Sequence, residues 1–243
     1  SLVRTTPTPL SQSRYRLAAT SVGNYALFGG GYSSTRIDVV DAYDTSLVRT
    51  TPTHLSQARY ALAATSIGNY ALFGGGSYDV VDAYDTSLVR TTPTPLAQAR
   101  QYLAATSIGD YALFGGGIQS SSKYDVVDAY DTSLVRTTQT PLSKARGILA
   151  ATSIGDYALF GGGHNTSTRI DVVDAYDTSL VRTTPTPLSQ ARDEFAATSI
   201  GNYALFGGGG YTDNTRSGVV DAYDTSLVRT TPTPLSQSRY RLA

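Results

Sequence analysis

The sequence contains no cysteine, methionine or tryptophan among its 243 residues, and its 19 basic side chains balance its 19 acidic ones. Without cysteine, no disulfide stabilises the fold and the redox compartment cannot be read. The charge balance disfavours a nucleic-acid or anionic membrane surface, because both require clustered basic side chains. No apolar run reaches the roughly 18 residues of a transmembrane helix, and we expect no signal peptide ahead of Ser1. We expect Ser1 to begin a processed chain or a segment of a longer one.

One stretch of sequence occurs five times. Each copy holds Phe-Gly-Gly-Gly, a short irregular segment, Val-Val-Asp-Ala-Tyr-Asp-Thr-Ser-Leu-Val-Arg-Thr-Thr, and then a leucine followed four residues later by an arginine. The tyrosines of this motif are Tyr43, Tyr84, Tyr130, Tyr176 and Tyr223. A period in the forties is typical of propellers and solenoids, in which each unit buries its apolar face only against its neighbours.

Each repeat predicts four short strands. In the first repeat, the runs 15–22 and 25–28 flank Gly23-Asn24, a pair that favours a tight hairpin. The run 39–44 alternates as a third strand, and 47–53 forms a fourth that ends at proline. The pattern therefore predicts an all-β chain with essentially no helix, and the paired alanines of each first strand suit a narrow central axis.

The repeat resembles a Kelch repeat. The glycine pair that closes the apolar strand 25–30, Tyr43-Asp44, Leu55 and Arg59 match the Kelch pattern in order. The Kelch tryptophan is missing from every copy, and Arg49 stands near its position in the first. The resemblance implies an all-β, five-bladed β-propeller with four antiparallel strands per blade. It implies no particular partner, because function does not follow from fold.

Residues 1–243 are expected to form a single propeller domain. The predicted blades span approximately 14–58, 59–99, 100–145, 146–191 and 192–238. Residues 1–18 and 226–243 are identical. A closed ring needs only one copy, so 1–13 and 226–238 are expected to compete as the closing strand. The other copy can then pair with a neighbouring molecule, which predicts self-association.

The repeats differ mainly at two places. One is the loop between the glycine triplet and Val-Val, which holds all the length variation, from three residues in the second repeat to nine in the fifth. The other is the pair of residues after the arginine: Tyr15-Arg16, Tyr60-Ala61, Gln101-Tyr102, Gly147-Ile148 and Asp193-Glu194. Because strands alternate in direction, both places should emerge on one rim. Such confined variation is typical of a binding surface, and drift at exposed positions is the alternative.

We predict a non-enzymatic scaffold that recognises a protein or glycan through this rim, without cofactor or metal. The candidate ligand-binding residues are Tyr15, Arg16, Tyr32, Tyr60, Tyr78, Gln101, Tyr102, Ile148, His164, Asp193, Glu194 and Tyr211. Tyrosines supply rigid contact area and the charged residues supply polarity. The differences between repeats favour one extended ligand over five identical sites. The alternative is a structural, self-assembling or designed repeat scaffold without a ligand.

Catalytic chemistry is not predicted. His54 and His164 stand at unrelated repeat positions and lack metal-ligand spacing. An acid-base pair needs carboxylates in unlike surroundings, and only Asp193 and Glu194 depart clearly from the repeating set. The recurring aspartates and arginines are expected to make structural hydrogen bonds. We therefore expect no enzyme and neither a nucleic-acid nor a membrane partner.

Overall fold

The computed structural model describes residues 4–212 and 215–239, in which five four-stranded antiparallel sheets each hold one repeat. The first sheet contains β1 (Ala18–Val22), β2 (Tyr25–Gly29), β3 (Val40–Tyr43) and β4 (Arg49–Thr50). The second contains β5 (Leu62–Ile67), β6 (Tyr70–Gly75), β7 (Val81–Asp85) and β8 (Arg90–Thr91). The third contains β9 (Ala104–Ile108), β10 (Tyr111–Gly115), β13 (Val127–Asp131) and β14 (Arg136–Thr138). The fourth contains β15 (Ala150–Ile154), β16 (Tyr157–Gly161), β17 (Val173–Asp177) and β18 (Arg182–Thr183). The fifth contains β19 (Ala196–Ile200), β20 (Tyr203–Gly207), β23 (Val220–Asp224) and β24 (Arg229–Thr230).

Two further hairpins lie inside variable loops. The loop of the third repeat forms β11 (Ile118–Gln119) and β12 (Ser122–Lys123), and that of the fifth forms β21 (Gly210–Thr212) and β22 (Thr215–Arg216). The described residues contain no helix. The prediction of an all-β chain built from repeated four-stranded units is confirmed.

Local sequence explains the turns within each sheet. Gly23 has a φ of 51°, and β1 pairs with β2 in the register Val22↔Tyr25, as a tight hairpin requires. After β3, the Asp44 carboxylate accepts hydrogen bonds from the backbone N–H groups of Ser46 and Val48, both at 2.9 Å. These two turns set the strand order along each sheet.

The outer strand boundaries differ from the prediction. The first strand begins at Ala18 rather than Tyr15, because Arg16 takes a left-handed backbone with a φ of 55°. The fourth strand is only Arg49–Thr50, since Leu47 is still in the turn with a φ of 60°. Tyr15 and Arg16, the pair that follows Arg14, therefore lie outside the sheet, at the edge where the variable loop begins.

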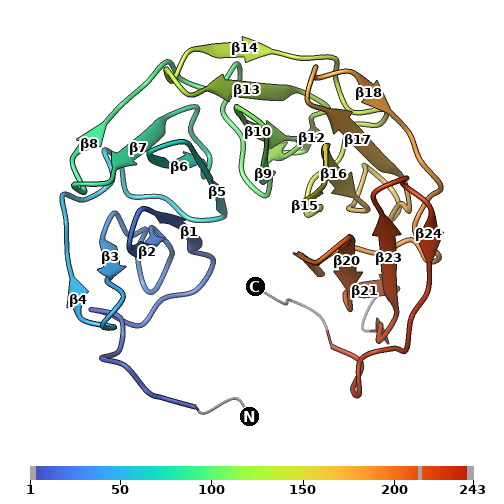
Figure 1. Cartoon of the computed structure of the whole chain (residues 1–243), viewed down its shortest axis with the longest axis horizontal. Coiled ribbons are helices and arrows are strands. Elements are labelled where there is room, and N and C mark those ends of the chain that lie inside the picture. Colours follow the sequence, from blue (N-terminus) through green and yellow to red (C-terminus); the bar gives the residue numbers. More distant parts are fainter. Residues whose placement is uncertain (1–3, 213–214, 240–243) are drawn as a thin grey trace.

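The sheets stack side by side through four hydrophobic clusters, each shared by consecutive sheets. In the first cluster, Leu27 and Val40 of the first sheet meet Phe73 and Tyr84 of the second. The first strands of successive sheets, β1, β5, β9, β15 and β19, contact one another along the inner side, as expected for strands around an axis (Figure 1). The arrangement is propeller-like.

The five sheets form an open arc, with the first and last sheets at its two ends (Figure 1). Within the described ranges, no hydrophobic cluster joins these two sheets. Ile200 of the last sheet is 68% exposed, whereas its counterparts Ile67, Ile108 and Ile154 are each 4% exposed. Each end of the arc therefore presents a sheet face to solvent.

The two terminal segments lie against the sheets nearest to them. Residues 4–14 form no strand, and the Thr8 carbonyl accepts a hydrogen bond from the Tyr43 hydroxyl at 2.7 Å. At the other end, β24 pairs with β23, and the Leu235 N–H donates to the Gly218 carbonyl at 2.8 Å. Each segment thus contacts one end of the arc.

Candidate binding rim

The two variable places of a repeat lie side by side. Antiparallel backbone bridges join the first residue of the post-arginine pair to the start of the variable loop. These bridges are Tyr15↔Tyr32, Gln101↔Ile118, Gly147↔His164 and Asp193↔Gly210. We call this surface the variable rim: the five post-arginine pairs together with loops 32–38, 77–79, 118–125, 164–171 and the described part of 210–218.

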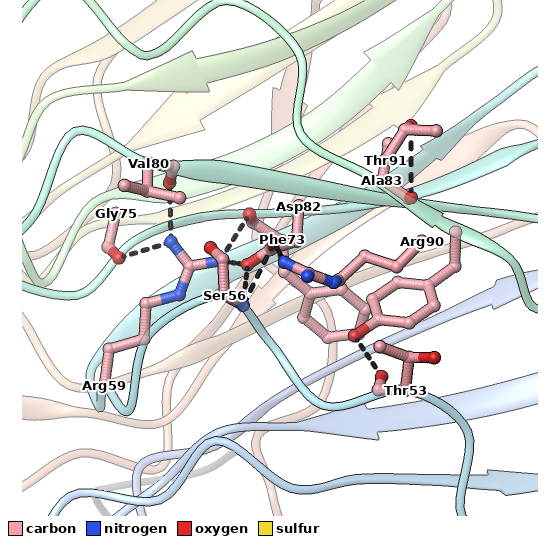
Figure 2. A network of polar contacts seen from close by, with 11 residues as sticks. Thr53, Ser56, Arg59, Phe73, Gly75, Val80, Asp82, Ala83, Arg90 and Thr91 are labelled. Atoms are coloured by element: carbon pink, nitrogen blue, oxygen red, sulfur yellow. Dashed lines mark hydrogen bonds and ion pairs between the residues drawn. The ribbon is translucent and has the colours of Figure 1, made fainter.

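A buried arginine anchors each post-arginine pair. In the second repeat, Arg59 Nη2 pairs with Asp82 and Nη1 donates to the Val80 carbonyl at 2.6 Å (Figure 2). Both charged side chains are fully buried, and the Ser56 N–H also donates to Asp82. Burial lowers the pKa of Arg59, and the Asp82 charge opposes this effect. The equivalent pairs, at 2.7 to 2.9 Å, are Arg14–Asp41, Arg100–Asp128, Arg146–Asp174 and Arg192–Asp221.

These anchors confirm the structural role expected for the recurring charges. Asp82 also accepts from Arg90 at 2.8 Å, so one carboxylate joins the segment before the sheet to its outer strand. A buried, hydrogen-bonded ion pair fixes geometry strongly, because loss of either partner leaves an uncompensated charge. The anchor places Tyr60-Ala61 at a defined point of the rim.

The second residue of every post-arginine pair has a left-handed backbone. The φ angles are 55° for Arg16, 53° for Ala61, 54° for Tyr102, 57° for Ile148 and 53° for Glu194. This conformation costs a non-glycine residue roughly 1–2 kcal/mol. Backbone hydrogen bonds link the row: Ala61 N–H donates to the Arg16 carbonyl at 2.9 Å, and Tyr102 N–H donates to the Ala61 carbonyl at 2.8 Å. Strain held at variable positions is a feature of ligand sites.

These strained residues line a cavity of about 580 Å³ that receives side chains from all five repeats. Its variable lining includes Arg16, Tyr102, Ile148 and Glu194. The residue that follows each pair adds an apolar wall of Leu17, Leu62, Leu103, Leu149 and Phe195. An apolar cavity with a few charged groups is the usual form of a ligand pocket, and its size lies within the range of such pockets.

A cluster of aromatic rings surrounds one cation beside this cavity. The Arg16 guanidinium lies 5.7 Å from the Tyr15 ring centre, 5.8 Å from Tyr60 and 5.3 Å from Tyr102. Tyr32 packs edge-on against Tyr15 and Tyr60, with ring centres 5.7 and 5.4 Å apart. Five of the predicted site residues, from three repeats, thus form one contact surface.

Two arginines of the variable loops were missed by the sequence prediction. Arg36 lies 5.7 Å from the Tyr60 ring centre, and its Nη1 donates to the Tyr78 hydroxyl at 2.9 Å. Arg169 Nε donates to Asp193 at 2.9 Å. Both arginines occur in the same Ser-Thr-Arg-Ile-Asp sequence, which was the available signal. Each reaches forward to the rim of the next repeat.

Comparison with known proteins identifies the fold but no family. No protein-family model and no curated protein matches the chain. The solved structure titled "Structure of YjhT" matches it with a TM-score of 0.71 and 13% identity, over 90% of this chain and 84% of that one. The fold is similar to that of YjhT. At this identity the likeness extends to the fold alone.

The remaining predicted residues lie elsewhere on the rim. Gln101 accepts a hydrogen bond from the Ser77 hydroxyl at 3.0 Å. His164 lies in the bridged loop of the fourth repeat. Tyr211, in β21, is 38% exposed. Among the described residues, no ring contact joins Tyr211 to the Arg16 cluster.

Across residues 4–212 and 215–239, no group of three or more His, Asp or Glu side chains has a metal-binding arrangement. In those same ranges, no helix is long and apolar enough to cross a bilayer.

Proposed function

We propose that this chain is a Kelch-like, five-bladed β-propeller that acts as a non-enzymatic binding protein, with the variable rim as its ligand face. The supporting observation is the convergence of the two variable places. They are separate in sequence, yet they form one surface with a cavity of about 580 Å³ and a cluster of tyrosines around Arg16. Tyrosine and arginine are the residue types that dominate binding energy at interfaces.

The ligand is a single extended one, a protein segment or a glycan. The first three repeats contribute the tyrosines around Arg16, whereas the fifth contributes Asp193 and Glu194. A ligand that spans the rim therefore meets an aromatic, cationic side and an acidic side. This asymmetry favours a protein segment over identical sugar sites, because five equal sites need five equal rims.

The carboxylates of the chain support a non-enzymatic role. The repeating aspartates are held in buried ion pairs with arginine, and Asp193 is bonded to Arg169. An acid-base pair needs two carboxylates whose surroundings set different proton affinities. The rim offers binding groups rather than such a pair.

A uniform-rim variant tests this proposal. All five repeats receive the Tyr60-Ala61 pair and the loop 77–79 of the second repeat. The chain and the variant are screened against a glycan array and a displayed peptide library. We expect the chain to select a ligand and the variant to lose it. Retained affinity in the variant contradicts the proposal.

The matched control is Asn24→Asp, in the hairpin turn between β1 and β2, away from the variable rim. The same position holds Asp110 in the third repeat and Asp156 in the fourth. We expect this variant to bind as the original chain does. Thermal unfolding of each variant shows that the scaffold is intact.

A further inference from the structure

The four junctions between consecutive sheets share one construction. A glycine at the end of the second strand lies against a phenylalanine ring of the next sheet, so close that an added Cβ would come within 2.7 to 2.9 Å of the ring. These contacts are Gly29 with Phe73, Gly74 with Phe114, Gly115 with Phe160 and Gly161 with Phe206. A side chain at the glycine is excluded, so the ring and the glycine are complementary shapes.

The last sheet presents this glycine surface without a ring. A Cβ on Gly207 would meet only Val220, at 3.6 Å, and a Cβ on Gly201 would meet nothing within 4 Å. A Cβ added to any of the counterparts of Gly201 would lie 3.2 to 3.5 Å from a threonine of the next sheet. Ile200, on the same sheet, is 68% exposed. The last sheet therefore exposes the same face that the earlier of two sheets contributes to an internal junction.

The first sheet presents the other half. Phe28 is only partly buried, although its counterparts Phe73, Phe114, Phe160 and Phe206 are each 0% exposed. Ala26 is exposed, although Ala71, Ala112, Ala158 and Ala204 are each 0% exposed. The sequence register places Thr45 where the other sheets hold the threonine that contacts a hairpin glycine.

We infer that these two faces bind each other between copies of the chain, the last sheet of one copy packing on the first sheet of a second copy. Phe28 then lies against Gly207, and Thr45 lies against Gly201. Ile200 is covered in the same contact. The four internal junctions are the template, because they join the same residue types in the same register.

The terminal segments fit this contact. Inside the chain, one segment bonds both sheets of a junction: Leu55 N–H donates to the Asp38 carbonyl before it, and Thr53 accepts from Tyr84 after it. At the ends, among the described residues, 4–14 hydrogen-bond only to the following sheet, and 229–239 hydrogen-bond only to the preceding one. The two segments match in sequence. In a junction between copies, one of the two terminal segments can make the hydrogen bonds to both sheets, and the other segment is then released.

The contact is heterologous, because each copy carries one face of each kind. A heterologous contact that does not close continues to add copies at both ends. We therefore expect a concentration-dependent series of oligomers. This inference is independent of the variable rim, and the uniform-rim variant should associate as the original chain does.

Sedimentation velocity over a range of protein concentrations tests the inference. The original chain should exceed its monomer mass of 25.7 kDa as concentration rises. Ala26→Lys obstructs the first sheet's face and Ile200→Lys obstructs the last sheet's face, at positions exposed in the single chain. Each variant alone should stay monomeric. An equal mixture should form dimers and nothing larger, because one good face of each kind remains.

Val135→Lys is the matched control, since Val135 is 56% exposed at the outer turn of the third sheet, and it should associate as the original chain does. A monomer at every concentration overturns the inference, including a monomer in which the arc has closed on itself. A mixture of the two blocked variants that remains monomeric also overturns it.

Discussion

The buried arginine is the residue on which each part of the variable rim depends. Arg100 donates to Asp128 at 2.9 Å and to the Phe114 carbonyl at 3.0 Å, in a site with no solvent exposure. The post-arginine pair of the third repeat follows directly. A long cation at this point holds the rim in place from within the sheet.

Removal of the carboxylate should therefore be costly. Asp128→Ala leaves Arg100 buried without its partner, and we expect a loss of about 3–5 kcal/mol in unfolding free energy. Asp131→Ala removes a turn carboxylate that accepts from two backbone N–H groups at 2.9 Å, and should cost about 1 kcal/mol. Denaturant unfolding of both variants measures the difference. Equal losses would contradict the role assigned to the anchor.

The strained leucine of the outer turn gives a second prediction. Leu47 has a φ of 60° and is 46% exposed. Its left-handed backbone is therefore strained, and its side chain gains only part of the stabilisation that full burial would give. Leu47→Gly should stabilise the chain by up to about 1 kcal/mol. Leu88 has a φ of 62° but packs on the first core cluster, so Leu88→Gly should gain less or lose stability. Thermal unfolding compares them, and a larger gain for Leu88→Gly would refute this reading.

At the scale of elements, the turns were predictable and the loop contacts were not. The Gly23-Asn24 pair predicted the first hairpin, because its chemistry is local. The predicted start of the first strand was wrong, because Arg16 has a left-handed backbone. The Arg16 carbonyl accepts a hydrogen bond from the Ala61 N–H of the next repeat. Likewise, one Ser-Thr-Arg-Ile-Asp sequence gives Arg36 aromatic neighbours and gives Arg169 a carboxylate. Only the fold brings these partners together.

The two loop arginines should respond differently to substitution. Asp193 is 5% exposed, so Arg169→Gln leaves a buried carboxylate short of its cation and should cost about 1–3 kcal/mol. Arg36→Gln loses an exposed bond to Tyr78 and should change stability much less. Chemical denaturation of the pair checks this order. The opposite order would show that the Asp193 contact does not support the loop.

For the whole molecule, the repeat period predicted the architecture but not the open arc. Copies of one motif predicted repeated four-stranded units, and residues 4–212 and 215–239 form sheets of this kind. The repeat sequence does not determine the angle between neighbouring sheets, because the same residues form every junction in an open or a closed arrangement. The state of the two end faces therefore had to come from the structure.

The tyrosines at the junctions predict how the whole molecule responds to alkali. Burial raises the pKa of Tyr84, Tyr130, Tyr176 and Tyr223, whose hydroxyls donate to threonine carbonyls. Their pKa in the unfolded chain is about 10. Because the pKa of these tyrosines is higher in the folded chain, their contribution to the unfolding free energy is complete below about pH 10. It is lost as the pH rises further. We expect cooperative unfolding in alkali.

Tyrosinate absorbance against pH follows that transition. The four buried tyrosines should ionise together with the loss of β-sheet circular dichroism. Ionisation of these four tyrosines without loss of the β-sheet signal would contradict their burial at the junctions.

The most direct test of a constant scaffold with one variable face is hydrogen exchange of the chain with and without a peptide selected from the displayed library. We predict slower exchange at the post-arginine pairs and the variable loops, including 15–16, 32–38 and 101–102. The outer turns, such as 44–47, should exchange unchanged. Protection confined to those outer turns, with none on the variable rim, would contradict the account.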